Sequence, residues 1–291
     1  MSTALTEVTT QSTGRGRHGT PKVVVGGVIV GVFVVVALFP GLVSSHDPLR
    51  QDLLHRLADP TSAHPLGTDA LGRDVWSRLV HGTRVDLRVG VLCALLPMVI
   101  GTVLGGLSGF YGGILDVVVG RLIELVQSFP VLVFFLAVLG ALGLAHPFLF
   151  LGPGELPIVL VFAAVGWIVY ARLIRGEVMR VRDLEYVQAA GAGGLSPLRV
   201  LIRHVLPNAI GQTVVYVVLD VGLAILALAT LSYLGLGVPA PVPEWGAMIA
   251  ESSAYFQAQW WLVVAPGVAI TVLGVGLALI GDGIDDLVKR S

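Results

Sequence analysis

The sequence predicts an all-α polytopic membrane protein with six transmembrane helices. Of its 291 residues, 55% are hydrophobic and only 13% are charged, whereas a soluble domain carries about 25% charged residues. Six apolar runs are each long enough to cross a bilayer, because a helix needs about 20 residues to span the hydrocarbon core and closes its own backbone hydrogen bonds there. The formal net charge of −1 gives no reason to expect a nucleic-acid partner.

The six runs divide the chain into a tail, an isolated first span and a core. They lie at residues 23–43, 87–109, 117–143, 157–176, 208–234 and 262–281. Residues 1–22 form a Ser-, Thr- and Gly-rich tail, which we expect to be disordered, together with the start of the first helix. The first span exceeds the 7–15 residues of a signal-peptide core, so we expect it to be retained. Residues 44–86 form an external segment, and residues 87–291 hold the other five spans.

The distribution of basic residues predicts the orientation. An even number of spans places both termini on one side, and arginine and lysine flank the first span, the loop after the fourth span and the C-terminus, which we therefore expect to be cytoplasmic. One segment opposes this assignment, because residues 46–84 carry five arginines. These are Arg50, Arg56, Arg73, Arg78 and Arg84. The sequence offers no reason for them.

Between the fourth and fifth spans the chain is charged and rich in glycine, and residues 185–208 read EYVQAAGAGGLSPLRVLIRHVLPN. Acidic residues favour a helix N-terminus, so the acids Asp183 and Glu185 predict that a short helix begins near residue 183. Gly193 and Gly194 suit the left-handed turn that ends it. The alternative is an ordinary solvated loop.

A second short helix follows the turn. Ser196 suits its N-cap and Pro197 its first position, where a missing backbone donor costs nothing. We expect it to run to Leu206 and to expose Arg199 and Arg203 on one face, before Pro207 opens the fifth span.

This stretch resembles the EAA loop of ATP-binding cassette (ABC) importer permeases, whose pattern is matched by Ala189, Ala190, Gly194 and Val205–Leu206–Pro207. The resemblance implies that the loop, residues 177–207, docks in a groove of a cytoplasmic ATPase and transmits its closure to the membrane helices. Gly191 and Gly193 depart from the usual pattern, and glycine weakens a helix interior, so we expect the docking helix to be short. The implied coupling residues are Glu185, Ala189, Ala190, Gly194, Ser196, Pro197, Arg199, Arg203, Leu206 and Pro207.

Three further blocks resemble the C-type subunits of dipeptide, oligopeptide and nickel importer permeases, whose fold is the type I ABC importer permease. The blocks are HPLGTDALGRDVWSRLVHGTR at 64–84, RLIELVQSFP at 121–130 and LSYLGLGVPAPVPEWGAMIAE at 231–251. The external family-motif residues are Gly67, Asp69, Gly72, Arg73, Asp74, Glu244 and Trp245. Three prolines interrupt the helix before Glu244 and Trp245, so we expect both to be presented on the external side. Trp245, Trp260 and Trp261 also suit an interfacial aromatic belt.

Charges inside the spans need a reason. Arg121 and Glu124 are three residues apart, so we expect a structural intramembrane ion pair. Asp220 lies 13 residues after Pro207, or about 20 Å along a helix, whereas the resemblance places an acid at the position of Leu228. Asp220 is either a polar contact for a peptide ammonium group in the translocation path or a buried hydrogen-bonding group facing the partner permease.

The chain has no phosphate-binding GxxxxGK[ST] motif, so no catalytic residue and no cofactor is assigned to it. The resemblance implies a B-type permease partner, two cytoplasmic ATPase domains, separate or fused, that bind ATP and Mg, and an extracytoplasmic substrate-binding protein. It implies a multi-pass protein of the bacterial cytoplasmic membrane, in contact with its lipid. The preference for arginine over lysine is typical of a GC-rich organism.

Other functions remain open at this level. The cargo is a dipeptide or oligopeptide, or else a nickel chelate or another small molecule. An ion-coupled secondary transporter would need more midplane polar groups than Asp220 and usually internal repeats, which we do not find. No HExxH or GxSxG motif indicates a membrane enzyme. No metal site is assigned, although the histidines within residues 46–81 leave one open, and Cys93 suits a small buried hydrophobe.

Overall fold

The structure is a computed structural model that describes residues 19–142 and 149–288. The predicted disordered tail and the basic residues at the C-terminus fall largely outside the described residues. Apart from an isolated bridge between Thr68 and Asp74, all the regular structure within the described ranges is helical. The predicted all-α fold is confirmed.

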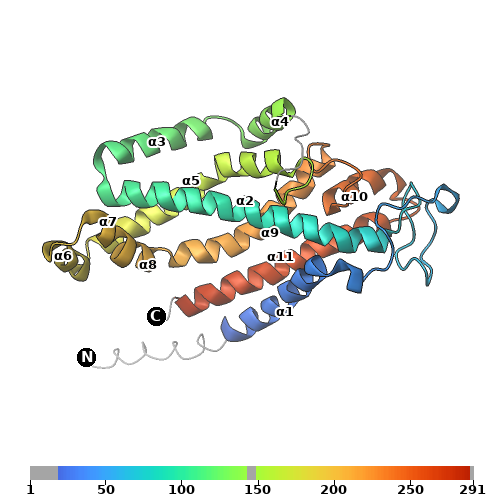
Figure 1. The fold of residues 1–291 in the computed structure, drawn as a ribbon, viewed down its shortest axis with the longest axis horizontal. Helices are drawn as coiled ribbons and strands as arrows, with labels where there is room; N and C mark the ends of the chain where they lie inside the picture. Colours follow the sequence, from blue (N-terminus) through green and yellow to red (C-terminus); the bar gives the residue numbers. More distant parts are fainter. Residues whose placement is uncertain (1–18, 143–148, 289–291) are drawn as a thin grey trace, which may run out of the picture.

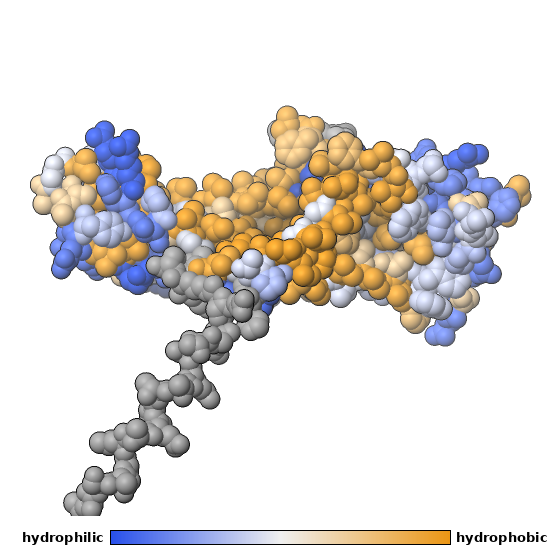
Figure 2. Space-filling model, turned by 90° about the horizontal axis from the view of Figure 1, so that it is seen from below, coloured by the Kyte–Doolittle hydropathy of each residue, from blue (hydrophilic) through white to orange (hydrophobic). Residues whose placement is uncertain are grey.

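Five helices are long and apolar enough to cross a membrane, and they run along the long axis of the molecule (Figure 1). They are α1 (Gly19–Leu38), α2 (Val75–Tyr111), α5 (Glu155–Arg182), α9 (Gly211–Tyr233) and α11 (Trp261–Val288). The surface has a broad hydrophobic middle and hydrophilic residues gathered toward the two ends (Figure 2). This pattern is typical of a protein whose middle lies in a bilayer.

The predicted third span, residues 117–143, is not one helix. It is divided into α3 (Gly113–Gln127) and α4 (Val131–Leu142), and the two are bent by 83° at the break. Pro130 causes the break, because proline has no backbone N–H and disfavours helical geometry in the residue before it. The chain therefore has five spans, or six if the bent pair is counted as one.

Helices α2 and α5 form the most extensive of the helix contacts described. The stripe Gly101, Gly105 and Gly109 on α2, with four-residue spacing, lies directly against the α5 backbone. A Cβ atom at Gly101 would lie 2.4 Å from the Trp167 carbonyl oxygen, and one at Gly105 would lie 2.2 Å from that of Ala171. Small residues at this spacing let two helices approach until their backbones touch.

Helices α1 and α11 form a second close pair. A Cβ atom at Gly26 would lie 2.5 Å from the carbonyl oxygen of Gly276. Lys22, near the start of α1, forms a 3.1 Å ion pair with Asp286, near the end of α11. The beginning of the first helix and the end of the last helix therefore lie together at one end of the bundle.

The shorter elements gather at the two ends of the bundle (Figure 1). One end holds α10 and the segment that joins α1 to α2, and the other end holds a hairpin between α5 and α9. At the first end they are η2 (Pro40–Leu42), η3 (Leu53–His55), α10 (Trp245–Ser252) and η5 (Ser253–Tyr255). At the hairpin end they are α6 (Glu185–Ala192), α7 (Pro197–Val200), the π-helix η4 (Leu201–Val205) and α8 (Leu206–Ala209).

A buried ion network explains two of the arginines in the segment before α2. The Arg78 guanidinium contacts Asp69 at 2.5 Å and Glu251 of α10 at 2.8 Å, and Arg73 contacts the same two carboxylates at 2.7 Å each. Removing one member of such a buried cluster leaves its partners unpaired and typically costs 3–5 kcal/mol. The network therefore ties the segment to α10.

Asp69 is held in its charged form by this network. Burial on its own would raise the pKa of Asp69, but the charge of Arg78, a backbone N–H and the charge of Arg73 outweigh burial and lower that pKa. A lowered folded-state pKa contributes stability above about pH 4, the ordinary value for an aspartate, and this contribution is lost as the pH falls through the lowered pKa. The connection to α10 is therefore stable at neutral pH.

Two more arginines of this segment are bound to the backbone. Arg84 donates to the carbonyl oxygens of Ala37 and Leu38, at 2.8 Å and 2.9 Å, where α1 ends and its last carbonyl groups lack helical partners. Arg56 donates to the carbonyl oxygen of Ala70 at 2.7 Å. The arginines that oppose the charge rule thus have structural partners in this fold.

Adding one methyl group to the glycine stripe should destabilise the protein. In Gly105→Ala the new Cβ atom meets the α5 backbone, which cannot rotate away, so we expect a loss of about 1–3 kcal/mol from overpacking and a lower unfolding temperature of the purified protein in detergent. Gly31→Ala on α1 is the matched control, because a Cβ atom there meets nothing within 4 Å. Equal unfolding temperatures for the two variants would contradict the close packing.

Candidate functional site

The hairpin between α5 and α9 contains the predicted coupling residues. Its first helix, α6, begins at Glu185, two residues later than expected, because Asp183 is still the C-cap of α5. It ends at Ala192, and Gly193 and Gly194 then turn the chain toward α7. The predicted order of helix, turn and helix is confirmed.

The turn that ends α6 is a Schellman motif. The backbone N–H of Leu195 donates to the carbonyl oxygen of Ala190 at 3.4 Å, and that of Gly194 donates to Gly191 at 3.0 Å. Gly194 has φ +86°, a left-handed conformation that side chains disfavour, whereas Gly193 keeps a helical φ of −71°. Gly194 alone therefore supplies the left-handed residue that the sequence assigned to the pair.

The second half of the hairpin differs from the prediction. Pro197 occupies the first position of α7 as expected, but the Ser196 side chain makes no capping hydrogen bond. The helix does not stop at Leu206: it continues through η4 and α8 almost directly into α9. Pro207 cannot donate to the carbonyl oxygen four residues earlier, and η4 widens just before it, where the Leu206 N–H donates to Leu201.

An apolar cluster fixes the hairpin to the membrane helices. Val187, the buried residue of α6, packs with Ile174, Val178 and Val181 of α5. The cluster also includes four residues from α7 to α8, which are Val200, Leu201, Val205 and Ala209. In addition, Arg182 donates to the carbonyl oxygen of Gly109 at the end of α2 at 2.7 Å. The hairpin is therefore bound to the ends of α2 and α5 and is continuous with α9.

The rest of α6 is open and small. Glu185 and Ala189 are exposed and Ala190 is half-buried, so backbone lies close to the surface. A hollow of about 460 Å³ lies beside α6 and is lined by residues that include Val187, Gln188 and Pro197. Arg199 and Arg203 are exposed on the following helix. A partner helix or groove could thus approach α6 closely beside a basic surface.

Asp220 has a hydrogen-bond partner within the chain. The Tyr170 hydroxyl of α5 donates to its carboxylate at 2.7 Å, and Asp220 is half-buried between α5 and α9. Leu228, two turns further along α9, is fully buried in an apolar cluster. The bond predicted toward another subunit therefore lies between two helices of this chain, and the role of Asp220 in a translocation path stays a prediction.

Comparison with known proteins assigns the family. The sequence model described as "Binding-protein-dependent transport system inner membrane component" matches residues 101–291, which contain the hairpin. The chain belongs to this family. The matched residues include the hairpin and most of the membrane helices, and the chain is thus a permease subunit of an ABC importer.

Curated relatives of this permease align over nearly the whole chain. The probable D,D-dipeptide transport system permease protein of Escherichia coli K12 is 39% identical over 269 residues, 92% of this chain and 87% of that protein. The dipeptide transport system permease protein of Alkalihalophilus pseudofirmus is 34% identical, covering 90% and 84%. The oligopeptide transport system permease protein of Bacillus subtilis is also 34% identical, covering 90% and 83%.

Two of the external motif residues are not presented to solvent. Glu244 and Trp245 are both fully buried, so the expectation of external presentation is wrong. Glu244 is the N-cap of α10 and accepts from the backbone N–H groups of Gly246 and Ala247 at 2.7 Å each. The Trp245 indole donates to the carbonyl oxygen of Leu79 at 3.0 Å. Both residues hold α10 against α2.

The other motif residues of this permease fold the segment before α2. Gly67 and Gly72 have φ +68° and +73°, and a Cβ atom on either would overlap backbone. Asp74 is the N-cap of α2 and accepts from the Ser77 N–H at 2.7 Å. Asp69 and Arg73 belong to the ion network. These positions therefore have structural roles at this end of the bundle.

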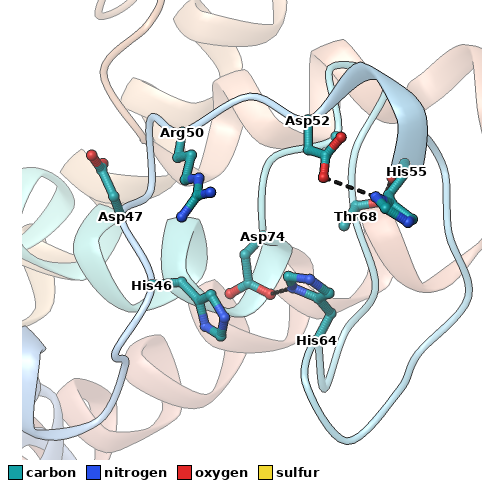
Figure 3. A pocket seen from close by; sticks show the side chains of 9 residues that line it. His46, Asp47, Arg50, Asp52, His55, His64, Thr68 and Asp74 are labelled. Carbon is teal, nitrogen blue, oxygen red and sulfur yellow. Dashed lines mark hydrogen bonds and ion pairs between the residues drawn. The ribbon is translucent and has the colours of Figure 1, made fainter.

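The histidines near this segment line a small polar pocket of about 210 Å³ (Figure 3). His64 contacts the carboxylate of Asp74 at 2.8 Å, and the rings of His46 and His64 lie 5.0 Å apart. A separate pair joins His55 and Asp52 at 2.8 Å. Among the described residues, no group of three His, Cys, Asp or Glu side chains is arranged to hold a metal ion. The geometry gives metal binding no support.

Sequence reasoning missed two features on which the site depends. The glycine stripe on α2 was visible as four-residue spacing in GTVLGGLSG, residues 101–109. The bond from Arg73 to Glu251 joins residues 178 positions apart, and no local pattern predicts it. The Arg121–Glu124 ion pair was predicted and forms at 2.7 Å.

Two glycine substitutions in the hairpin should have opposite effects on α6. Gly194→Ala forces a side chain into a left-handed conformation and should cost about 1–2 kcal/mol, whereas Gly191→Ala replaces glycine inside a helix with open space around it and should contribute about 1 kcal/mol. Hydrogen exchange of residues 185–195 should accelerate in the first variant and slow in the second. The same direction of change in both would contradict the Schellman geometry.

Substitutions at Tyr170 and Asp220 should separate structure from transport. Tyr170→Phe leaves the half-buried carboxylate without its donor and should lower stability by about 1–3 kcal/mol. Asp220→Asn keeps an acceptor oxygen and should lower it less. Uptake kinetics of Asp220→Asn decide the remaining alternative: unchanged kinetics fit the interhelical bond, whereas a selective loss for substrates with a free ammonium group would establish a contact in the translocation path.

Proposed function

We propose that this chain is the C-type permease subunit of an ATP-driven importer of dipeptides or oligopeptides, located in the bacterial cytoplasmic membrane. The observation that carries the proposal is the hairpin. It exposes a short helix of small residues while an apolar cluster fixes its other side to the spans. A solvated loop has no need of this anchoring.

The proposed complex contains a B-type permease, two cytoplasmic ATPase domains, separate or fused, and an extracytoplasmic substrate-binding protein. ATP and Mg bind to the ATPase domains, since this chain has no phosphate-binding motif. The hairpin end then faces the cytoplasm and the α10 end faces outward. The structural partners of Arg73, Arg78 and Arg84 support this orientation, because they account for arginines on the outer side.

In the proposed mechanism, closure of the ATPase pair displaces α6. The apolar cluster passes this displacement to α5, and the continuous helix from α7 passes it to α9. The glycine stripe holds α2 against α5, so α2 moves as well. The spans change access to the substrate without any bond chemistry in this chain.

The peptide cargo is supported by the printed functions of the relatives, which transport dipeptides, D,D-dipeptides and oligopeptides. A nickel chelate is the second cargo of this subfamily, and no feature of the described residues favours it. An ion-coupled mechanism receives no support from Asp220, because that carboxylate already accepts a hydrogen bond from Tyr170.

The proposal predicts that a bulky charge on α6 abolishes coupling. Ala189 is exposed, so Ala189→Arg keeps the helix but prevents close approach of a partner. We expect ATPase recovery with the affinity-purified permease complex to fall at least tenfold, equivalent to about 1.4 kcal/mol, and peptide-stimulated ATP hydrolysis to be lost.

The matched control is Leu54→Arg, at an exposed position at the opposite end of the bundle. It should leave ATPase recovery unchanged. Recovery of the unmodified chain without a second permease or an ATPase would refute the proposed assembly. Normal ATPase binding by Ala189→Arg would exclude α6 as the coupling surface.

A further inference from the structure

Helix α3 carries an ion pair on its outward face. The guanidinium of Arg121 and the carboxylate of Glu124 are 2.7 Å apart, and their side chains remain 76% and 65% exposed. Other exposed residues of α3 are large and apolar, including Val117 and Leu125. The pair therefore projects from an otherwise hydrophobic helix into whatever surrounds this chain.

The pair lies within the membrane-spanning part of the fold. On the opposite face of α3, Val119 and Ile123 are buried against Trp167 and Ile168, near the middle of α5. Val126, just before the break, packs on the same cluster. The outward face at residues 121–130 is thus level with the centre of the bundle rather than with its hydrophilic ends.

The break after α3 gives a second, independent observation on the same segment. Residues 128–130 are non-helical, and all three are exposed. Irregular backbone at membrane depth is tolerated only where protein covers it or where it borders a water-filled cavity, because lipid offers its polar groups no hydrogen-bond partner. Exposed charges at this depth require the same surroundings.

A polar contact extends this strip to α5. The Arg172 guanidinium donates to the side-chain oxygen of Gln127 at 2.6 Å, and both residues are exposed. The strip therefore runs along α3 as Arg121, Glu124 and Gln127 and continues to Arg172. It presents one carboxylate and two guanidinium groups.

We propose that this polar strip borders the hydrated translocation path and contacts the charged ends of the peptide in transit, a role that rests on the proposed function. A zwitterionic peptide carries an ammonium group, which suits Glu124, and a carboxylate, which suits the planar donors of Arg121 or Arg172. The strip takes peptides of different sequence, because it addresses the two termini and not the side chains between them.

The test is the access of water to the strip in the assembled complex. Ser128→Cys replaces one small polar residue by another at the exposed break, and the native Cys93 is only 2% exposed. Val28→Cys on α1, at a position that is 63% exposed in this chain, is the lipid-facing control. The complex is placed in lipid nanodiscs, where both sides are accessible, and treated with a charged, water-soluble thiol reagent.

We expect Ser128→Cys to react at least tenfold faster than Val28→Cys, and a saturating dipeptide with its binding protein to slow that reaction severalfold. Equal rates for the two variants would overturn the proposal by placing the strip against lipid or a partner. Fast labelling that peptide does not change would overturn the contact with substrate.

Glu124→Gln provides a second readout with little change in shape. It should reduce uptake of a dipeptide with a free ammonium group severalfold more than uptake of the N-acetylated dipeptide. An equal reduction for both would refute an ammonium contact. Peptide-stimulated ATP hydrolysis by the unmodified complex is measured in the same preparations: if it is present while labelling fails, only this inference falls, and if it is absent, the proposed function itself fails.

Discussion

Backbone contact between α2 and α5 is the constraint on which the rest of the structure depends. Gly101, Gly105 and Gly109 remove every side-chain atom from one face of α2, so the α5 carbonyl groups lie directly against it. α5 leads into the hairpin at one end of the molecule, and α2 begins at Asp74 near the other end. With no flexible side chain between them, a displacement of α5 has to move α2.

The two ends of the bundle satisfy their polar groups in different ways. At the hairpin, the Schellman turn and the π-helix use backbone bonds almost alone, so few side chains are committed and α6 remains free for a partner. At the opposite end, Asp69, Arg73, Arg78 and Glu251 form a buried network that requires all four members. One end is therefore suited to contact and the other to rigidity.

Much of the fold could be predicted because hydrocarbon admits few solutions. An apolar run of about 20 residues has to be a helix there, and the sequence places five such helices well. The third run failed because residues on both sides of Pro130 are equally apolar, so composition hid the bend. Burial of Glu244 could not be read locally either: its two hydrogen bonds are local, but the helices that cover it come from distant parts of the chain.

The two sets of charges inside the spans make opposite demands on their surroundings. Asp220 accepts a hydrogen bond from Tyr170 and is half-buried between α5 and α9, so its needs are met by this chain alone. Arg121 and Glu124 neutralise each other yet stay exposed, and so do the backbone groups of the break that follows them. A bilayer satisfies neither the exposed pair nor that backbone. The outward face of α3 is thus where the chain is incomplete by itself, and a second subunit enclosing water against it completes the membrane fold.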